Sequence, residues 1–187
     1  MNIKKLCQKI INIFIMKQKI SVVVFVLSVF SLASFSQEND IDEANATIKE
    51  FKETDPGMDK FFTSATGYAV FPGIGKGGLV IGGAAGNGTL YKGGTPVADT
   101  KMSQVTIGFQ AGGQKYAEVI FFEDIETYND FVSGDFEFAA QVSAVALTSG
   151  VSADAAYKDG LLVVTMAIGG LMYEASVGGQ KFKVTPY

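Results

Sequence analysis

The pattern of hydrophobic and polar positions between residues 67 and 91 alternates short apolar runs with glycine-rich stretches. The apolar runs are residues 68–71 and 79–81, and the segment Thr89, Leu90 and Tyr91 ends the region. Two glycine-rich stretches separate them, residues 73–78 and the triplet Gly86, Asn87 and Gly88. Glycine costs about 1 kcal/mol relative to alanine inside a helix, whereas β-branched and aromatic runs between Gly and Asn turns are typical of strands. The pattern therefore predicts short paired strands joined by glycine turns.

A helical spacing precedes this region. Apolar residues recur at intervals of three and four over residues 39–53, at Ile41, Ala44, Ile48 and Phe51. Asp55 followed by Pro56 is typical of an N-cap and the first residue of a helix, so a second helix is predicted over residues 56–64. We expect both helices to cover one side of a sheet, and an amphipathic helix that contacts a membrane is the alternative.

The second half of the chain continues with short strands and turns. Further strands are predicted at residues 102–110, 116–122, 136–147, 161–168, 171–177 and 181–184. The first two of these are expected to form a hairpin through Gly112 and Gly113. Asp124 can cap a short helix whose inward face consists of Ile125, Tyr128, Phe131 and Val132.

These elements together predict an α+β fold that is rich in β structure. We expect an antiparallel sheet or partly closed barrel of short strands punctuated by glycine, covered by two N-terminal helices and one short mid-chain helix. No linker rich in proline or serine divides residues 37–187, which are therefore expected to form a single domain.

The start of the chain is typical of a signal peptide. It carries five lysines and no acidic residue before the apolar run of residues 20–32, and the small residues Ser34 and Ser36 follow that run. An apolar run of this length is too short to span a membrane as a helix, which needs about 20 residues. We therefore expect cleavage near Ser36 and export to the periplasm or outer envelope, with translation starting at Met1 or at Met16.

The charge of the predicted mature chain limits its partners. Residues 37–187 keep all 19 acidic residues and ten of the 15 basic ones, so their net charge is −9. Nucleic-acid binding draws most of its affinity from basic residues on phosphates, and a strongly acidic chain is not suited to it. The same charge opposes non-specific adhesion to anionic lipids.

The composition also limits the chemistry. The sequence contains no His and no Arg, and its one cysteine, Cys7, precedes the apolar run of the predicted signal peptide. These absences exclude Ser-His-Asp and Cys-His nucleophiles, zinc sites built on His or Cys, and arginine clamps on phosphates. The acidic residues between 118 and 137 do not match a calcium-binding loop. We therefore expect no enzyme, no catalytic residue, no metal and no cofactor.

Residues 73–78 satisfy the G-x-G-x-x-G pattern of dinucleotide-binding turns. In such a site the pyrophosphate lies at the N-terminus of the helix that follows. Here a strand-like run follows instead, so the pattern is interpreted as a β-turn and no nucleotide is expected.

The same stretch resembles a known family. The segments YAVFPGIGKGGLVIGG, residues 68–83, and IGFQAGG, residues 107–113, are similar in content and order to motifs of the SYLF lipid-binding domain. The resemblance covers residues 40–180 and implies non-enzymatic lipid binding, with a phospholipid or membrane surface as the partner. The absence of arginine and the net negative charge favour a less charged lipid, such as a phosphatidylethanolamine, or a lipid tail held in a cavity.

Lys76 is the central candidate for lipid contact, because no other charged residue lies between Lys60 and Lys92. An ammonium group beside clustered turn amides can hold a phosphate, and the alternative is a solvated lysine that blunts a sheet edge. The candidate lipid-binding residues are Lys76, Tyr68, Phe71, Gly75, Gly77, Gly78 and Phe109. A second function class stays open, a structural or interaction protein that pairs with an envelope protein through glycine-rich sheet edges.

Overall fold

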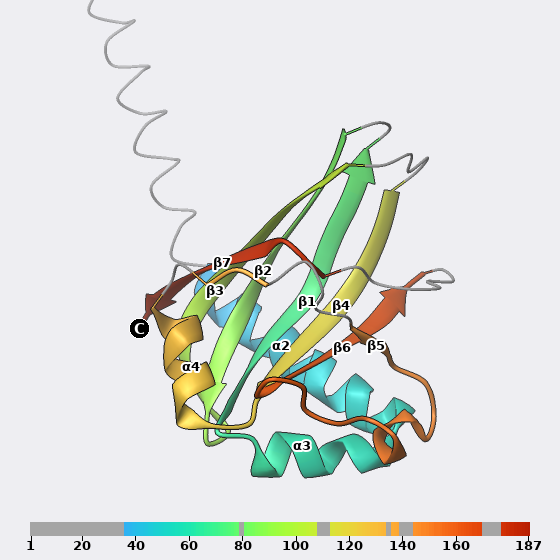
Figure 1. Cartoon of the computed structure of the whole chain (residues 1–187), viewed down its shortest axis with the longest axis vertical. Coiled ribbons are helices and arrows are strands. Elements are labelled where there is room, and N and C mark those ends of the chain that lie inside the picture. Colours follow the sequence, from blue (N-terminus) through green and yellow to red (C-terminus); the bar gives the residue numbers. More distant parts are fainter. Residues whose placement is uncertain (1–35, 79–80, 108–112, 134–135, 139–143, 170–176) are drawn as a thin grey trace, which may run out of the picture. The chain divides into compact units, whose positions relative to one another are not determined.

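The computed structural model describes residues 36–78, 81–107, 113–133, 136–138, 144–169 and 177–187 (Figure 1). The segment Asp40–Tyr187 forms one compact unit. Of the chain before it, only residues 36–39 are described, as the beginning of helix α2, Ser36–Thr54. The predicted signal peptide lies outside the described residues except for Ser36.

The compact unit is built on a seven-stranded mixed sheet, which confirms the α+β, β-rich fold. Its strands are β1 Gly67–Gly78, β2 Ile81–Lys92, β3 Thr95–Ile107, β4 Gly113–Phe122, β5 Val145–Ala146, β6 Leu161–Ile168 and β7 Gln180–Pro186. Their order across the sheet is β5-β6-β4-β1-β2-β3-β7, and every pair is antiparallel except β5 with β6. The order begins and ends with different strands, so the sheet is not closed into a barrel.

Strands β1 and β2 are longer than predicted, because both run through their glycines. Residues 73–78 lie inside β1, and Gly86, Asn87 and Gly88 pair with β3 inside β2, so neither stretch is the predicted turn. Hydrogen bonding to a neighbour on each side holds glycine in an extended form, and such tertiary pairing overrides a weak intrinsic preference. The predicted strand 79–81 falls mostly on residues 79–80, which lie outside the described chain.

A β-bulge interrupts β1 at Pro72 and Gly73. Phe71 lies opposite Glu118 of β4, but the next paired residue, Ile74, lies opposite Tyr116, so β1 holds one extra residue. Proline cannot donate a ladder hydrogen bond, and bulges are among the few places where a strand tolerates it. The bulge shifts the register by one residue, and the pairing of β1 with β4 resumes at Ile74.

Of three predictions for the second half of the chain, two strands are confirmed and one hairpin is wrong. Residues 161–168 form β6 and residues 181–184 lie in β7, as predicted. The predicted hairpin is wrong, because β4 pairs with β1 and β6. The hairpin was predicted because the two strands are adjacent along the chain. Instead, β4 pairs on both sides with strands that are not its neighbours in sequence order.

The predicted long strand over residues 136–147 is also wrong where the chain is described. Only β5 and a single bridge from Glu137 to Lys181 are formed there. The alternating pattern of this segment finds a partner along β6 only at Val145 and Ala146. Residues 139–143 and most of the predicted strand 171–177 lie outside the described chain.

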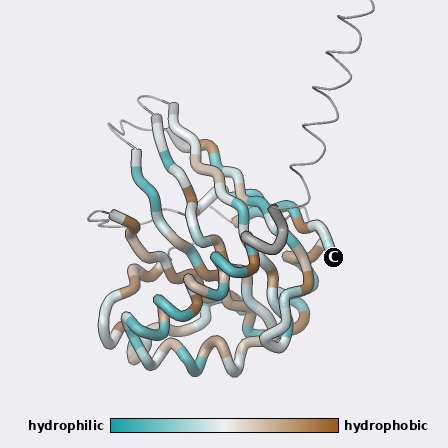
Figure 2. The backbone as a smooth tube through the Cα atoms, turned by 180° about the vertical axis from the view of Figure 1, so that it is seen from behind, coloured by the Kyte–Doolittle hydropathy of each residue, from teal (hydrophilic) through white to brown (hydrophobic). Residues whose placement is uncertain are grey.

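The two faces of the sheet carry separate hydrophobic cores, since side chains alternate along each strand. On the helix face, strand residues such as Tyr68 and Val70 pack with helical residues, namely Ala44, Phe51, Met58, Phe61 and Phe62. On the α4 face, Phe71 and Ile120 pack with Tyr128 and Phe131 of α4, Ile125–Val132. Figure 2 shows the corresponding mixture of hydrophilic and hydrophobic positions along the backbone.

The two N-terminal helices are present and meet the helix face, as predicted. Asp55 caps the second one with Pro56 behind it, but the first turn is the 3-10 helix Pro56–Met58 and the α-helix α3 spans Asp59–Ser64. No helix in the described part of the chain is both long and apolar enough to cross a membrane.

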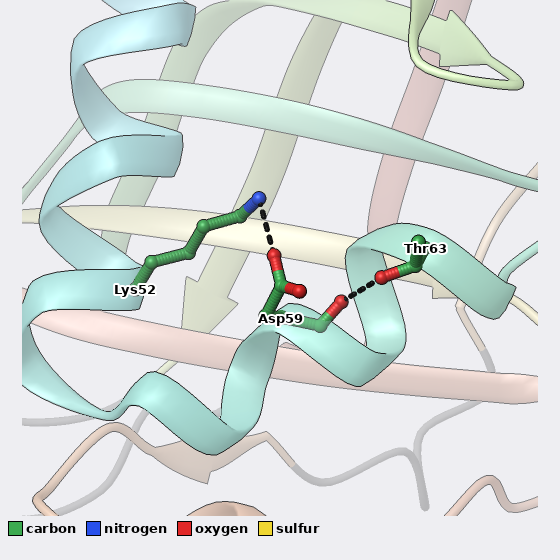
Figure 3. A network of polar contacts seen from close by, with 3 residues as sticks. All are labelled: Lys52, Asp59 and Thr63. Carbon is green, nitrogen blue, oxygen red and sulfur yellow. Dashed lines mark hydrogen bonds and ion pairs between the residues drawn. The ribbon is translucent and has the colours of Figure 1, made fainter.

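An exposed polar contact joins the two helices (Figure 3). Lys52 Nζ of α2 lies 2.7 Å from Asp59 Oδ1 of α3, and the hydroxyl of Thr63 donates to the backbone carbonyl of Asp59. The ammonium also lies 5.2 Å from the ring centre of Phe62. Exposed ion pairs contribute about 0–1 kcal/mol, so this contact adds little to the stability of the helix pair.

The carboxylate of Asp55 connects the helices to a distant loop. Its Oδ1 accepts a hydrogen bond from Gly57 N at 3.0 Å, and its Oδ2 accepts one from Ser152 N at 2.7 Å. The bond from Ser152 is the main reason that the pKa of Asp55 lies below its ordinary value. One side chain therefore fixes two segments that are far apart in sequence.

Helix α4 forms where it was predicted and begins at the predicted cap. The side chain of Asp124 accepts a hydrogen bond from Thr127 N at 2.8 Å. Tyr128 and Phe131 are buried as expected, but Ile125 is 50% exposed. Ile125 is the first residue of a two-turn helix, and only the following turns reach the sheet.

Candidate functional site at the glycine-rich end of the sheet

The structure keeps three of the predicted site residues together at the end of β1. Gly75, Lys76 and Gly77 are consecutive and lie opposite residues 113–115 of β4 and residues 83–85 of β2. In Figure 1 this is the upper end of the sheet, where β1 and β4 extend away from α3. Because both neighbouring strands are hydrogen-bonded, the three residues have a fixed extended backbone.

The side chain of Lys76 lies on the α4 face. It has the same orientation as Ile74, and its cross-strand neighbours are Ala84 and Gln114. Lys76 is partly buried, and within the described ranges no carboxylate lies close enough to form an ion pair with it. Its ammonium group therefore has hydrogen-bond donors for an anion.

On the helix face the same end of the sheet is almost bare. A Cβ atom added at Gly75 or Gly77 would meet no atom within 4 Å, and one added at Gly113 would meet only Lys76 O at 3.9 Å. Val105 of β3 lies at the same end and is 77% exposed. The backbone is therefore open to a ligand at Gly75, Gly77 and Gly113, while Lys115, directly opposite Gly75, brings a charged side chain to the same face.

Tyr68 and Phe71 do not join this site. Tyr68 is 5% exposed on the helix face and stacks on Tyr91 at 5.0 Å between ring centres. Phe71 is fully buried on the α4 face, 5.7 Å from the ring of Phe182. Both rings therefore serve the two cores and have no surface to offer a ligand.

The remaining two predicted site residues add little to the geometry. Gly78 is the last residue of β1 and pairs with Gly82. Phe109 lies outside the described residues.

A polar cavity that the sequence did not indicate lies beside the bulge in β1. Its volume is about 160 Å³, and it is lined by Asp40, Glu43, Pro72, Gly73, Asn87, Gly88 and Lys115. The bulge creates part of its wall, and the stem of Lys115 lies over Gly73, where an added Cβ would come within 2.6 Å of Lys115 Cε. Pro72 inside a strand pattern was the only local signal for this site.

Negative charge accumulates at this cavity. Partial burial raises the pKa of Asp40 above its ordinary value, and the nearby carboxylates of Asp99 and Glu43 raise it further. Lys101 acts in the opposite direction but does not cancel these effects. The carboxylates would therefore be stabilised by a positively charged group in the cavity.

A second group missed from the sequence is the buried carboxyl of Glu118 on the α4 face. Its Oε2 accepts a hydrogen bond from Gln180 Nε2 at 3.1 Å, and the same amide group lies 3.3 Å from the hydroxyl of Tyr116. Burial raises the pKa of Glu118 to about 8, so this acid is mainly protonated at neutral pH. Burial likewise raises the pKa of Tyr116.

The other oxygens of this cluster are left without a hydrogen bond among the described residues. They include Glu118 Oε1, Gln180 Oε1 and the hydroxyl of Thr165, which lies directly opposite Glu118 on β6. Buried polar groups without partners destabilise a fold by about 1–3 kcal/mol each. Since all three residues are almost fully buried, the cluster has no exposed surface for a large ligand.

The described residues contain no group of three or more His, Cys, Asp or Glu side chains that could hold a metal ion.

The paired positions of β1 and β2 bear on the alternative function, in which a partner strand pairs with a glycine-rich sheet edge. Both strands lie inside the sheet with a neighbour on each side, so their glycine-rich edges are already occupied. A partner strand would have to use another edge.

Comparison with known proteins gives limited information. No known family profile matches the chain, so the SYLF resemblance stays an expectation. The chain is similar to Beta cell expansion factor A of Aeromonas veronii, with 31% identity over 139 residues. The aligned region covers 73% of this chain and 52% of that protein, so the chain spans about half the length of the curated relative it matches.

Proposed function

We propose that the protein is a non-enzymatic phospholipid-binding protein of the bacterial cell envelope, and that it contacts lipid through the glycine-rich end of its sheet. The observation that carries the proposal is the position of Lys76. Lys76 lies opposite Ala84 of β2 and Gln114 of β4, and no carboxylate in the described chain forms an ion pair with it. The resemblance to SYLF domains and the predicted export signal support the same function and location.

The physical basis combines one charge with an accessible backbone. A lipid phosphate can accept hydrogen bonds from Lys76 on the α4 face, and the open backbone around Gly75, Gly77 and Val105 lies on the helix face of the same end. The two faces contact lipid together when this end of the sheet enters the lipid interface. A single exposed ion pair contributes only about 0–1 kcal/mol. Most of the affinity must then come from apolar contact, which fits a protein whose net charge opposes purely electrostatic adhesion.

Sedimentation with vesicles that contain phosphatidylethanolamine and phosphatidylglycerol tests this proposal. We expect Lys76→Glu to reduce the bound fraction several-fold while circular dichroism and thermal stability stay unchanged. Lys158→Glu is the matched control, because it makes the same charge change at an exposed residue outside the glycine-rich end. Wild-type binding by the Lys76→Glu protein would overturn the role of Lys76.

Mass spectrometry of material extracted from the purified protein distinguishes the two function classes. A stoichiometric phospholipid supports lipid binding. Protein free of lipid but purified with a second polypeptide would instead favour the structural or interaction function. Cell fractionation that finds the protein in the cytoplasm would contradict the proposed envelope location.

A further inference from the structure

The polar cavity beside the β1 bulge carries charges of both signs at separate places on its wall. Asp40 and Glu43 come from α2, and Lys115 comes from β4. No ion pair in the described chain satisfies these three side chains. A ligand that carries a positive and a negative group at a short distance would complement all of them.

The size of the cavity limits the ligand to a small group. Its volume of about 160 Å³ is below the range of about 300–1,000 Å³ found for sites that enclose a whole drug-sized molecule. The wall at the bulge is backbone, because Pro72, Gly73 and Gly88 contribute to it. A headgroup-sized part of a larger molecule fits such a site, whereas an acyl chain finds no apolar lining.

The charges also select the kind of cation. Lys115 would repel a divalent metal ion held by the two carboxylates, so an isolated metal is disfavoured. Quaternary ammonium groups are recognised mainly through aromatic faces, and none of the lining residues is aromatic. A primary ammonium group offers three N–H donors, which two carboxylates and the amide oxygen of Asn87 can accept.

We propose that this cavity binds a primary ammonium group linked to a phosphate, the chemistry of a phosphoethanolamine headgroup. Asp40 and Glu43 accept hydrogen bonds from the ammonium, and Lys115 donates to the phosphate. The inference rests on the proposed phospholipid function and names the headgroup class. Partial burial raises the pKa of Asp40 and the nearby carboxylates of Asp99 and Glu43 raise it further, so a cation in the cavity would stabilise its charged form.

Two variants with the same charge change test the assignment. Asp40→Asn combined with Glu43→Gln removes both carboxylates from the cavity. Asp42→Asn combined with Glu50→Gln removes two exposed carboxylates from the same helix that do not line the cavity. Each protein is measured with phosphatidylcholine vesicles, with vesicles of phosphatidylcholine plus phosphatidylethanolamine, and with soluble phosphoethanolamine and phosphocholine by calorimetry.

For the wild type and the Asp42/Glu50 control, we expect at least five-fold tighter binding to vesicles that contain phosphatidylethanolamine. The Asp40/Glu43 variant should lose this preference and keep its binding to phosphatidylcholine. Equal affinity of the wild type for both kinds of vesicle would overturn the inference. A preference that persists in the Asp40/Glu43 variant would also overturn it, because the headgroup would then be bound elsewhere.

Binding of the soluble compounds tests this inference independently of the proposed lipid-binding function. If no vesicle binds but phosphoethanolamine binds and is lost in the Asp40/Glu43 variant, the cavity assignment holds and the lipid function fails. If vesicles bind through Lys76 without a preference for phosphatidylethanolamine, the lipid function holds and the cavity assignment fails. Binding of phosphocholine as tightly as phosphoethanolamine would contradict the selection of a primary ammonium.

Discussion

The side-chain amide of Gln180 donates a hydrogen bond to Oε2 of Glu118 over 3.1 Å, although 62 residues separate them. The contact joins β7 to β4 on the α4 face, and both residues are fully buried. Burial raises the pKa of Glu118 to about 8 and outweighs the opposing effect of the bond from Gln180. The proton on this carboxyl is therefore linked to folding.

We expect the free energy of unfolding to fall as the pH rises from about 4.5 to about 8 because of Glu118. The pKa is raised from 4.5 in the folded state, so the folded protein holds this proton more tightly than the unfolded chain does. The stabilisation from this proton is fully present below the pKa of the unfolded chain, 4.5. It is lost as the pH rises to the pKa of the folded protein, about 8, by up to about 1.4 kcal/mol per pH unit. Urea unfolding at a series of pH values measures it.

Glu118→Gln is the matched variant for this prediction, because it keeps the shape and removes the titration. Its stability should vary less with pH over the same range. An identical pH dependence in both proteins would contradict the prediction. If the variant does not fold, the carboxyl chemical shift of Glu118 in the wild type should still titrate near pH 8.

Asp55→Ala should destabilise the fold by about 2 kcal/mol. The change removes the cap of the 3-10 helix and leaves Ser152 N without its acceptor, and hydrogen bonds to charged groups contribute about 1.5–3 kcal/mol. Asp124→Ala is the comparison, since that carboxylate only caps α4 and an N-cap contributes about 1 kcal/mol. Equal losses in chemical denaturation would show that the bond to Ser152 contributes nothing.

Alanine substitutions should distinguish a crowded glycine in β2 from an open glycine in β1. A Cβ at Gly88 would lie 2.4 Å from Val70 O and 2.7 Å from the ring of Phe71, so Gly88→Ala should cost about 2 kcal/mol or more. Gly75→Ala meets no atom within 4 Å and should change stability by less than about 0.5 kcal/mol. Melting temperatures that fall equally in both variants would be inconsistent with the described register.

The hydroxyl of Tyr91 should couple energetically to Asn45. It donates a hydrogen bond to Asn45 Oδ1 at 2.9 Å and so attaches α2 to β2. A double-mutant cycle with Tyr91→Phe and Asn45→Ala should give a coupling of about 1 kcal/mol. The pair Tyr91→Phe and Lys49→Ala serves as the control and should be additive. A coupling near zero in the first cycle would argue against this attachment of the helix.

Local signals in the sequence were sufficient for elements that depend on near neighbours. The caps at Asp55 and Asp124 and the boundaries of β6 were predicted correctly, because each depends on a few consecutive residues. The strand pairing was not predictable in this way. Residues 73–78 carry the composition of a turn, yet pairing with β2, which follows directly, and with the more distant β4 holds them in β1.

The candidate site could likewise be predicted from the sequence only in part. The sequence singled out Lys76 through its isolation along the chain, and the structure leaves that residue available at the end of β1. It could not indicate the cavity, because Asp40 and Lys115 are brought together only when α2 packs on the sheet. The sequence grouped Tyr68 and Phe71 with Lys76, whereas the structure buries the two rings in opposite cores, because they lie three positions apart along β1 and so point to opposite faces.

The position of β7 has a consequence for the time course of folding. β1, β2 and β3 are consecutive and can pair through short connections, whereas β7 is the last described strand and returns to β3 from far along the sequence. Pairing between distant segments slows folding. Until residues 180–186 pair with β3, Glu118 lacks the hydrogen bond from Gln180, so this carboxyl gains its partner only in a late step of assembly.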